Sequence, residues 1–366
     1  MATLHIFNPE HDLALAFGSE YFTPPHAARE LRTNMGFLPA LWAQDGDLVL
    51  VDDVDYAVKA SQRFSKQSAD VLFLSLDDLK KNSISEHATV TISPWGWDAA
   101  LCHRLKRAGI PEHLLPSQQQ LSEIRLLSSR EQSVALLADI RKQRSSSLLV
   151  GESCCVHDFS SLFKVVESVG DCVIKAPWSS SGRGVRYLMK NEGPDASLCG
   201  WISRVLEQQG QIVVEPFYRK IKDFAMEFQL TEDGRVEYLG LSLFHTQRAT
   251  YVGNLLATEE YKRAEISKYV PETLLTEVAS SIIAWMEKRG ERVYAGPFGV
   301  DMMIVGGEKG YQLHPCVELN LRRTMGHVAL ALTPKPTEPR QVMTIVHDVN
   351  YQLRITPAEN NFVTVV

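Results

Sequence analysis

Two carboxylates and an amide share the stretch of sequence that offers the clearest chemistry. Asp301 lies in one apolar, strand-like run, and Glu318 and Asn320 lie in the next. The glycine-rich break at 306–310 predicts an antiparallel hairpin that sets Asp301 roughly opposite residues 316–318. Asn320 follows Glu318 by two positions and so projects from the same face. Oxygens gathered in an apolar hairpin are unfavourable without a positive charge among them, which indicates a Mg²⁺ site.

Two arginines, Arg322 and Arg323, follow this set directly. Guanidinium groups bind phosphate oxygens well, so they could neutralise the same nucleotide that a metal ion would hold. The alternative is a solvated hairpin end whose acids pair with these arginines. For the Asp…Glu-x-Asn pattern taken alone, this alternative is favoured, and the other segments of the chain decide between the two.

A run of small residues in the stretch 171–188 indicates a phosphate-binding loop. A strand ends at Lys175, and a second strand follows the run. Small residues let backbone N–H groups approach phosphate oxygens, and a lysine at the strand end adds a charge. The Walker A order is absent, and an ordinary hairpin turn is the alternative. The residues of this loop are Ser179, Ser180, Ser181, Gly182, Arg183 and Gly184.

The stretch 211–230 predicts a strand that closes on Glu215 and a second strand that carries Asp223. Taken in order, these segments resemble the ATP-grasp superfamily. The SSSGRGVR loop is similar to that of the biotin carboxylase branch, VVEPF to the adenine hinge, KDFAMEF to the ribose-contacting strand and VELNLR to the metal-binding E-x-N-x-R. The resemblance covers roughly residues 120–330.

This resemblance implies an α/β and α+β fold, with an open N-terminal α/β (pre-ATP-grasp) domain followed by a two-lobed ATP-grasp domain. We expect the N-terminal domain in residues 1–115, a linker helix region in 116–147, a small lobe with the phosphate loop in 148–216, and a large lobe with the metal site and tail in 217–366. The short apolar runs near the N-terminus predict a mostly parallel sheet.

The resemblance also implies residue roles and an activity. The activity is that of an ADP-forming ligase, which uses ATP and Mg²⁺, or Mn²⁺ in its place, to activate a small carboxylate for an amine or another nucleophile. A small-molecule kinase and a non-catalytic nucleotide-binding module are the alternatives. The metal ligands would be Asp301, Glu318 and Asn320. The residues around the nucleotide would be Arg130, Lys175, Arg322, the loop 179–184, Glu215, Pro216, Phe217 and Tyr218 near adenine, and Asp223 at the ribose.

The substrate side of the site is expected in loops after two N-terminal strands, because ligands of open α/β sheets bind beyond the carboxyl ends of strands. Asn8 and His11 lie in one such loop, and Trp95 lies in the other. Asp12 and Asp98, in the same loops, are predicted to cap the helices that follow.

Arg248 could hold a substrate carboxylate bidentately, and it could equally be a surface arginine. These polar loops favour a small carboxylate-bearing molecule, such as an amino acid or a short peptide.

The composition of the chain limits the classes of molecule that it is expected to bind. The 366 residues carry a net charge of −6, with a pI of about 6.0, which favours neither nucleic acid nor an anionic membrane. The absence of a long apolar run indicates a cytoplasmic protein rather than a membrane protein. Its six cysteines show no C-x-x-C spacing, so a zinc site is not predicted. The oligomeric state is left open, a homodimer being compatible with the sequence.

Overall fold

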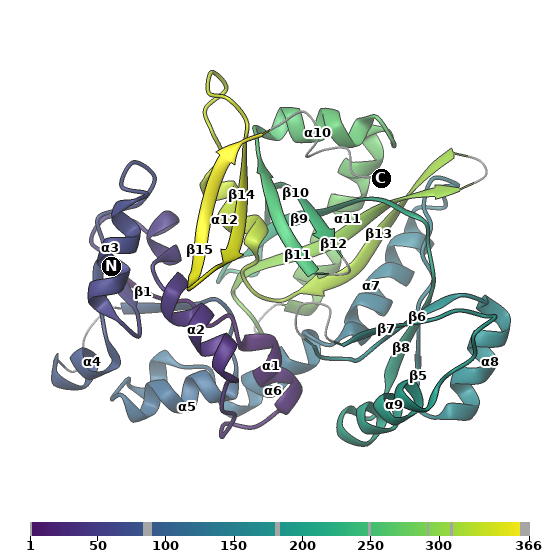
Figure 1. Cartoon of the computed structure of the whole chain (residues 1–366), viewed down its shortest axis with the longest axis horizontal. Coiled ribbons are helices and arrows are strands. Elements are labelled where there is room, and N and C mark those ends of the chain that lie inside the picture. The colour runs from purple at the N-terminus through teal and green to yellow at the C-terminus, as the bar shows by residue number, and fades with distance from the viewer. Residues whose placement is uncertain are drawn as a thin grey trace.

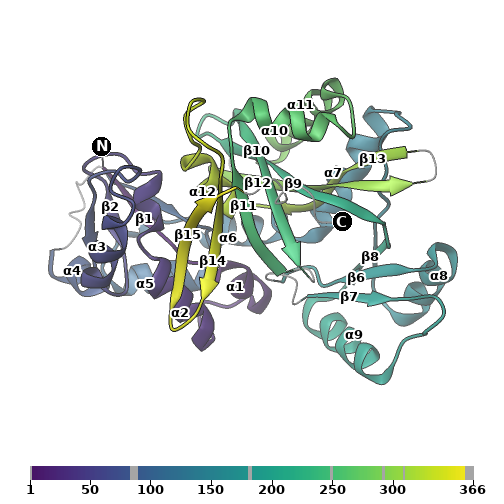
Figure 2. The same ribbon diagram turned by 45° about the horizontal axis from the view of Figure 1, so that its top comes forward.

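The computed structural model describes residues 2–82, 90–179, 184–247, 250–290, 293–307 and 310–358. Three sheets organise the chain, and Figure 1 shows them as an N-terminal domain at the left, a large central sheet and a small lobe at the lower right. Figure 2 keeps the same order after rotation. In the described part of the chain, no helix is both long and apolar enough to cross a membrane.

The N-terminal domain is built on a parallel sheet with strand order β3-β2-β1-β4, as the alternating apolar runs predicted. Its strands are β1 (Ala2–Ile6), β2 (Leu48–Leu50), β3 (Leu72–Leu74) and β4 (Val90–Pro94). Its helices are α1 (His11–Phe17), α2 (His26–Met35), the 3-10 turn η1 (Leu38–Leu41), α3 (Val54–Gln62), α4 (Leu76–Asn82) and α5 (Ala99–Arg107).

Two linker helices lead from this domain into the lobes, after the 3-10 turn η2 (Glu112–Leu114). The first is α6 (Gln118–Leu127), whose start is fixed by a capping box between Ser117 and Gln120. The second is α7 (Arg130–Gln143), which packs against β13 of the large lobe. The N-terminus of α7 therefore stands beside the predicted metal hairpin.

The small lobe is an antiparallel sheet with strand order β5-β8-β6-β7 and two helices. Its strands are β5 (Cys154–Val156), β6 (Cys172–Lys175), β7 (Val185–Leu188) and β8 (Ile212–Pro216). The helices α8 (Phe159–Val169) and α9 (Ala196–Gln209) pack with the sheet around a separate apolar core that includes Leu162, Ile174 and Ile202.

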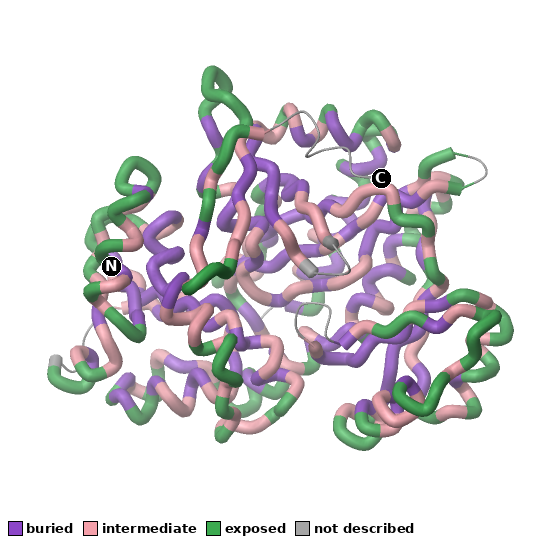
Figure 3. Tube along the Cα trace, in the orientation of Figure 1, coloured by how far each residue is buried: buried purple, intermediate pink, exposed green. Residues whose placement is uncertain are grey.

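The large lobe is an antiparallel sheet with strand order β13-β12-β9-β10-β11-β14-β15. Its strands are β9 (Lys220–Leu230), β10 (Val236–Gln247), β11 (Thr250–Leu256), β12 (Gly296–Gly307), β13 (Gly310–Asn320), β14 (Gln341–His347) and β15 (Tyr351–Pro357). Its helices are α10 (Glu259–Ser267), α11 (Glu272–Gly290) and α12 (Met325–Ala331). The tail therefore supplies two strands of this sheet, and Figure 3 shows how fully the central strands are buried.

One core joins the N-terminal domain to the tail strands. Phe37 and Trp95 from the N-terminal domain pack in the same apolar cluster as Val328 of α12 and Met343 of β14. Helix α2 also contacts β15. The N-terminal domain is thus fixed against the large lobe by apolar burial, and its strand-end loops face the motif that follows Asn320.

Candidate nucleotide and metal site

The predicted metal hairpin is present with the predicted pairing. Asp301 of β12 lies directly opposite Glu318 of β13, and Asn320 pairs with Gly299. The Asn320 side chain hydrogen-bonds to Asp301. Side chains two positions apart on one strand share a face, so the two carboxylates and the amide gather at one place. The sequence therefore predicted the register of this hairpin correctly.

The electrostatics of the hairpin suit a divalent cation. Burial and the adjacent Glu318 carboxylate raise the pKa of Asp301 to about 7, although the guanidinium of Arg322 opposes the shift. Two carboxylate oxygens with an amide oxygen are a hard donor set, which Mg²⁺ and Mn²⁺ prefer. Among the described residues, no cluster of three or more His, Cys, Asp or Glu side chains could hold a metal ion, so this site would depend on the amide and on ligand oxygens.

Arg130 connects the hairpin to the small lobe. Its Nη2 donates to Glu318 Oε1 at 2.7 Å, and its Nη1 donates to the Ala176 carbonyl and to Ser179 Oγ, both at 2.6 Å. The backbone N–H of Arg130 also donates to the Pro177 carbonyl. One guanidinium, positioned by the first turn of α7, thus links a predicted metal ligand to the start of the predicted phosphate loop.

Lys175 and Glu215 form a buried ion pair, with Nζ and Oε2 2.5 Å apart. They lie on the neighbouring strands β6 and β8. The ammonium also donates to the Val317 carbonyl of β13 at 3.4 Å, and Ser153 Oγ donates to the other carboxylate oxygen. The predicted phosphate lysine and the predicted hinge glutamate therefore lie together where the lobes meet, against the strand that carries Glu318.

The other predicted nucleotide residues surround this junction. Phe217 is 46% exposed and packs edge-on against Tyr187 of β7. The Tyr218 hydroxyl accepts a hydrogen bond from the Glu152 N–H. Asp223 accepts from Lys220 and from Thr246 Oγ1. Pro216 ends β8, and Gly184 precedes β7. Ser180, Ser181, Gly182, Arg183 and Arg248 lie outside the described residues, so their predicted roles stay predictions.

Asp12 does not cap its helix, which corrects the sequence-based prediction. The N-cap position of α1 is occupied by Glu10, without a side-chain cap. Asp12 instead accepts two hydrogen bonds from Arg322, each 2.8 Å long. Burial opposes both charges, but the pairing lowers the pKa of Asp12 and raises that of Arg322. No signal in the sequence joins positions so far apart.

The predicted substrate loops are held together by Asp98. This residue caps α5, as predicted, through the Leu101 N–H, and its other oxygen accepts from Asn8 Nδ2 at 3.1 Å. His11 Nδ1 lies 3.4 Å from the same oxygen. Trp95 is only 6% exposed and packs edge-on against Phe7. These contacts join the two loops, and His11 lines one cavity with Glu318, while the predicted substrate contacts of Asn8, His11 and Trp95 stay predictions.

Glu227 is a buried carboxyl to which the sequence analysis assigned no role. A Cβ on Gly299 would lie 2.5 Å from its Oε2, and one on Gly326 would lie 1.8 Å from its Oε1, so both glycines are needed to fit it. Its Oε2 lies 3.1 Å from His327 Nδ1. Burial and the nearby charge of Asp301 raise the pKa of Glu227 to about 8. In the sequence, the two glycines are the one signal of this close packing.

A small cavity adjoins the metal hairpin. His11, Asp12 and Leu15 of α1 line it on one side, and Trp178 and Ser179 line it on another. Glu318 and Asn320 complete the wall. The N-terminal domain, the start of the phosphate loop and the predicted metal ligands therefore meet around one space.

Comparison with solved structures identifies the fold. The chain is similar to N5-carboxyaminoimidazole synthetase from Staphylococcus aureus complexed with ADP, with 14% identity, a TM-score of 0.50, and coverage of 94% of this chain and 82% of that one. It is also similar to a biotin carboxylase β-γ-ATP complex from Campylobacter jejuni, with 12% identity, a TM-score of 0.52, and coverage of 94% and 75%. No protein-family model and no curated protein sequence matches the chain. The structural likeness confirms the predicted ATP-grasp fold.

Proposed function

We propose that this chain, which has the ATP-grasp fold, is an ADP-forming ligase that uses ATP and Mg²⁺, or Mn²⁺ in its place, to activate a small carboxylate. The observation that carries the proposal is the pairing of Asp301 with Glu318, with Asn320 on the same face. This oxygen set lies where the two lobes and the N-terminal domain meet. ADP and a nucleotide triphosphate analogue in the similar solved structures support a nucleotide at this junction.

Asp301, Glu318 and Asn320 would hold the metal ion, since their oxygens already share one face of the hairpin. A divalent cation there would supply charge for the phosphate oxygens and for the charge that develops during transfer. A divalent cation there would lower the pKa of Asp301 again, because its charge favours the ionised carboxylate that burial and Glu318 disfavour.

Three cationic side chains would neutralise the phosphates. Arg130, Lys175 and Arg322 each contact a carboxylate in this structure, respectively Glu318, Glu215 and Asp12. These pairs hold the cations in defined positions before a ligand arrives, and such preorganisation is what phosphoryl transfer requires. The adenine would lie between the lobes near residues 215–218, with the ribose at Asp223.

The reaction proposed here starts at a carboxylate oxygen of the substrate. This oxygen attacks the γ-phosphorus of ATP, the bond from that phosphorus to the bridging oxygen breaks, and ADP leaves with the electron pair. An amine or another nucleophile then attacks the acyl carbon of the acylphosphate, inorganic phosphate leaves, and the nucleophile loses its proton. The substrate carboxylate would approach from the side of His11 and Asp12, which line the small cavity with Glu318.

A screen for ADP release, with amino acids and dipeptides offered singly and in pairs, tests this function. A pair of substrates that releases ADP and inorganic phosphate in equal amounts supports the ligase. ADP release without free phosphate, together with a phosphorylated substrate, would instead establish a kinase. Saturable ATP binding without turnover on any offered pair would favour a nucleotide-binding module over an enzyme of this substrate class.

A further inference from the structure

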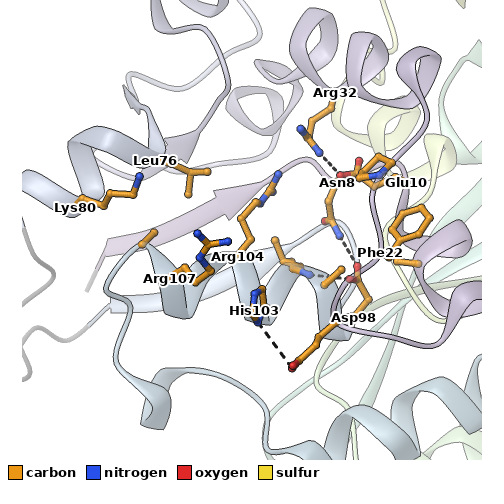
Figure 4. Close-up of a pocket in the computed structure, with 16 residues that line it drawn as sticks. Asn8, Glu10, Phe22, Arg32, Leu76, Lys80, Asp98, His103, Arg104 and Arg107 are labelled. Atoms are coloured by element: carbon orange, nitrogen blue, oxygen red, sulfur yellow. Dashed lines mark hydrogen bonds and ion pairs between the residues drawn. The ribbon is translucent and has the colours of Figure 1, made fainter.

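A separate cavity lies within the N-terminal domain. It has a volume of about 340 Å³, within the usual range for small-molecule sites. Its lining comes from the loop after β1 and from α1, α2, α4 and α5, and Figure 4 shows the side chains that surround it. In the sheet order β3-β2-β1-β4, β2 and β3 lie on one side of β1 and β4 lies on the other. The strand order therefore reverses at β1, between the parallel strands β1 and β4. Ligands of open parallel sheets bind beyond the strand ends at such a switch point.

Three acidic side chains line this cavity, and each lies beside a partner. Glu10 pairs with Arg32, which also donates to Asp52. Asp98 accepts from Asn8 and from the Leu101 N–H, and Glu20 lies 3.9 Å from His103 Nδ1.

Arg104 is a cation of this cavity that no carboxylate contacts directly, although Glu10, Asp52 and Asp98 act on it at longer range. Among the described residues its side chain makes no hydrogen bond and no ion pair, and its Nε is shielded from solvent without a partner. Figure 4 shows its side chain extending from α5 into the space between Leu76 and Asn8. A buried guanidinium N–H without a hydrogen-bond partner is costly, and a bound anion would offset that cost.

The cavity is distinct from the junction proposed for the nucleotide, because α1 separates the two. His11, Asp12 and Leu15 of α1 line the small cavity beside Glu318. Ala14 of the same helix lines the Arg104 cavity. A ligand beside Arg104 would therefore bind without displacing any group assigned to ATP or to the metal ion.

We propose that this cavity binds a small anionic molecule, with a carboxylate or phosphate group held by Arg104. Arg107 and Lys80 add positive charge to the lining. The apolar surface of Ala14 and Leu101 suits a ligand with a compact hydrocarbon part. The cavity shares Asn8 with the predicted substrate loops, but Arg104 belongs to no site assigned to the proposed ligase activity.

Titration of the full-length protein with inorganic phosphate and with malonate, followed by the arginine Nε–H resonances in ¹H–¹⁵N spectra, tests the site. The Arg104 resonance is assigned from its loss in Arg104→Lys, which keeps the charge. A saturable shift of that resonance is expected, and the probe that binds more tightly identifies the anionic group. Arg104→Met should weaken binding about tenfold or more, whereas Arg29→Met, an exposed arginine on α2, should bind like the wild type.

The proposal is overturned if neither probe shifts the Arg104 resonance at about 10 mM, a concentration that would reveal even weak affinity. It is also overturned if Arg104→Met binds the probe as well as the wild type. ATP binding by Arg104→Met is measured in parallel and should be unchanged. A failure of ATP binding in the wild type would refute the nucleotide site alone, since the resonance titration reports on Arg104 itself.

Discussion

Replacing Asp301 by asparagine should stabilise the metal-free protein at neutral and alkaline pH. In the folded chain, burial and Glu318 raise the pKa of Asp301 to about 7 from an ordinary value of 3.8. A carboxyl whose pKa is higher in the folded than in the unfolded chain contributes its full stability at pH values below its unfolded-state pKa. That stability is lost as the pH rises through its folded-state pKa. The shift of about 3 units corresponds to at most about 4 kcal/mol above pH 7. Asparagine keeps the volume and removes the charge.

Urea unfolding in EDTA, from about pH 4 to about pH 8, measures this effect. The free energy of unfolding of Asp301→Asn minus that of the wild type should be near zero at about pH 4. This difference should increase with pH and should level off above about pH 7. Asp348→Asn, in the exposed turn between β14 and β15, is the matched control and should show no such trend. A variant less stable than the wild type at about pH 8, or a difference independent of pH, would refute the assignment of unfavourable charge to this hairpin.

Two further predictions concern ion pairs. Asp12→Asn should lower the free energy of unfolding by about 1 to 3 kcal/mol, because it leaves the Arg322 guanidinium without its bidentate partner; an unchanged melting temperature would show that the pair contributes nothing. Glu215→Gln and Lys175→Met should each destabilise the protein by about 3 kcal/mol, because each single change leaves a buried charge unpaired. The double variant should lose less stability than the two single variants added together. Additive costs in urea unfolding would contradict this.

The hairpin could be predicted from the sequence because its information is local. The two apolar runs and the glycine-rich break indicated a hairpin with Asp301 opposite residues 316–318, and a bulge between Asp301 and Met303 sets the pairing with Glu318. The ends of β6 at Lys175 and of β8 near Glu215 followed from the same kind of pattern. The order of these segments then led to the fold that the solved structures confirm.

The long-range pairings could not be predicted, because side-chain contacts between domains leave no periodic signal. Asp12 was expected to cap α1, since Asp favours helix starts, but the position of Arg322 across the domain boundary decided its role. The packing of Trp95 against Phe7 is likewise a long-range contact that the sequence pattern did not reveal. Arg104 was not singled out at all, since a buried guanidinium N–H without a hydrogen-bond partner is visible only once its surroundings are known.

The most direct test of the central claim is calorimetric titration with ATP, with and without Mg²⁺, of the wild type and of Glu318→Gln. Because this change deletes a carboxylate ligand and keeps the side-chain volume, the wild type should bind ATP more tightly with Mg²⁺, and the variant should lose about tenfold or more of that enhancement. Melting curves of both proteins check that the loss of the ion pair to Arg130 has not unfolded the variant. Absence of ATP binding at about millimolar concentration, or an equal Mg²⁺ enhancement in the two proteins, would contradict the nucleotide and metal site proposed for this chain.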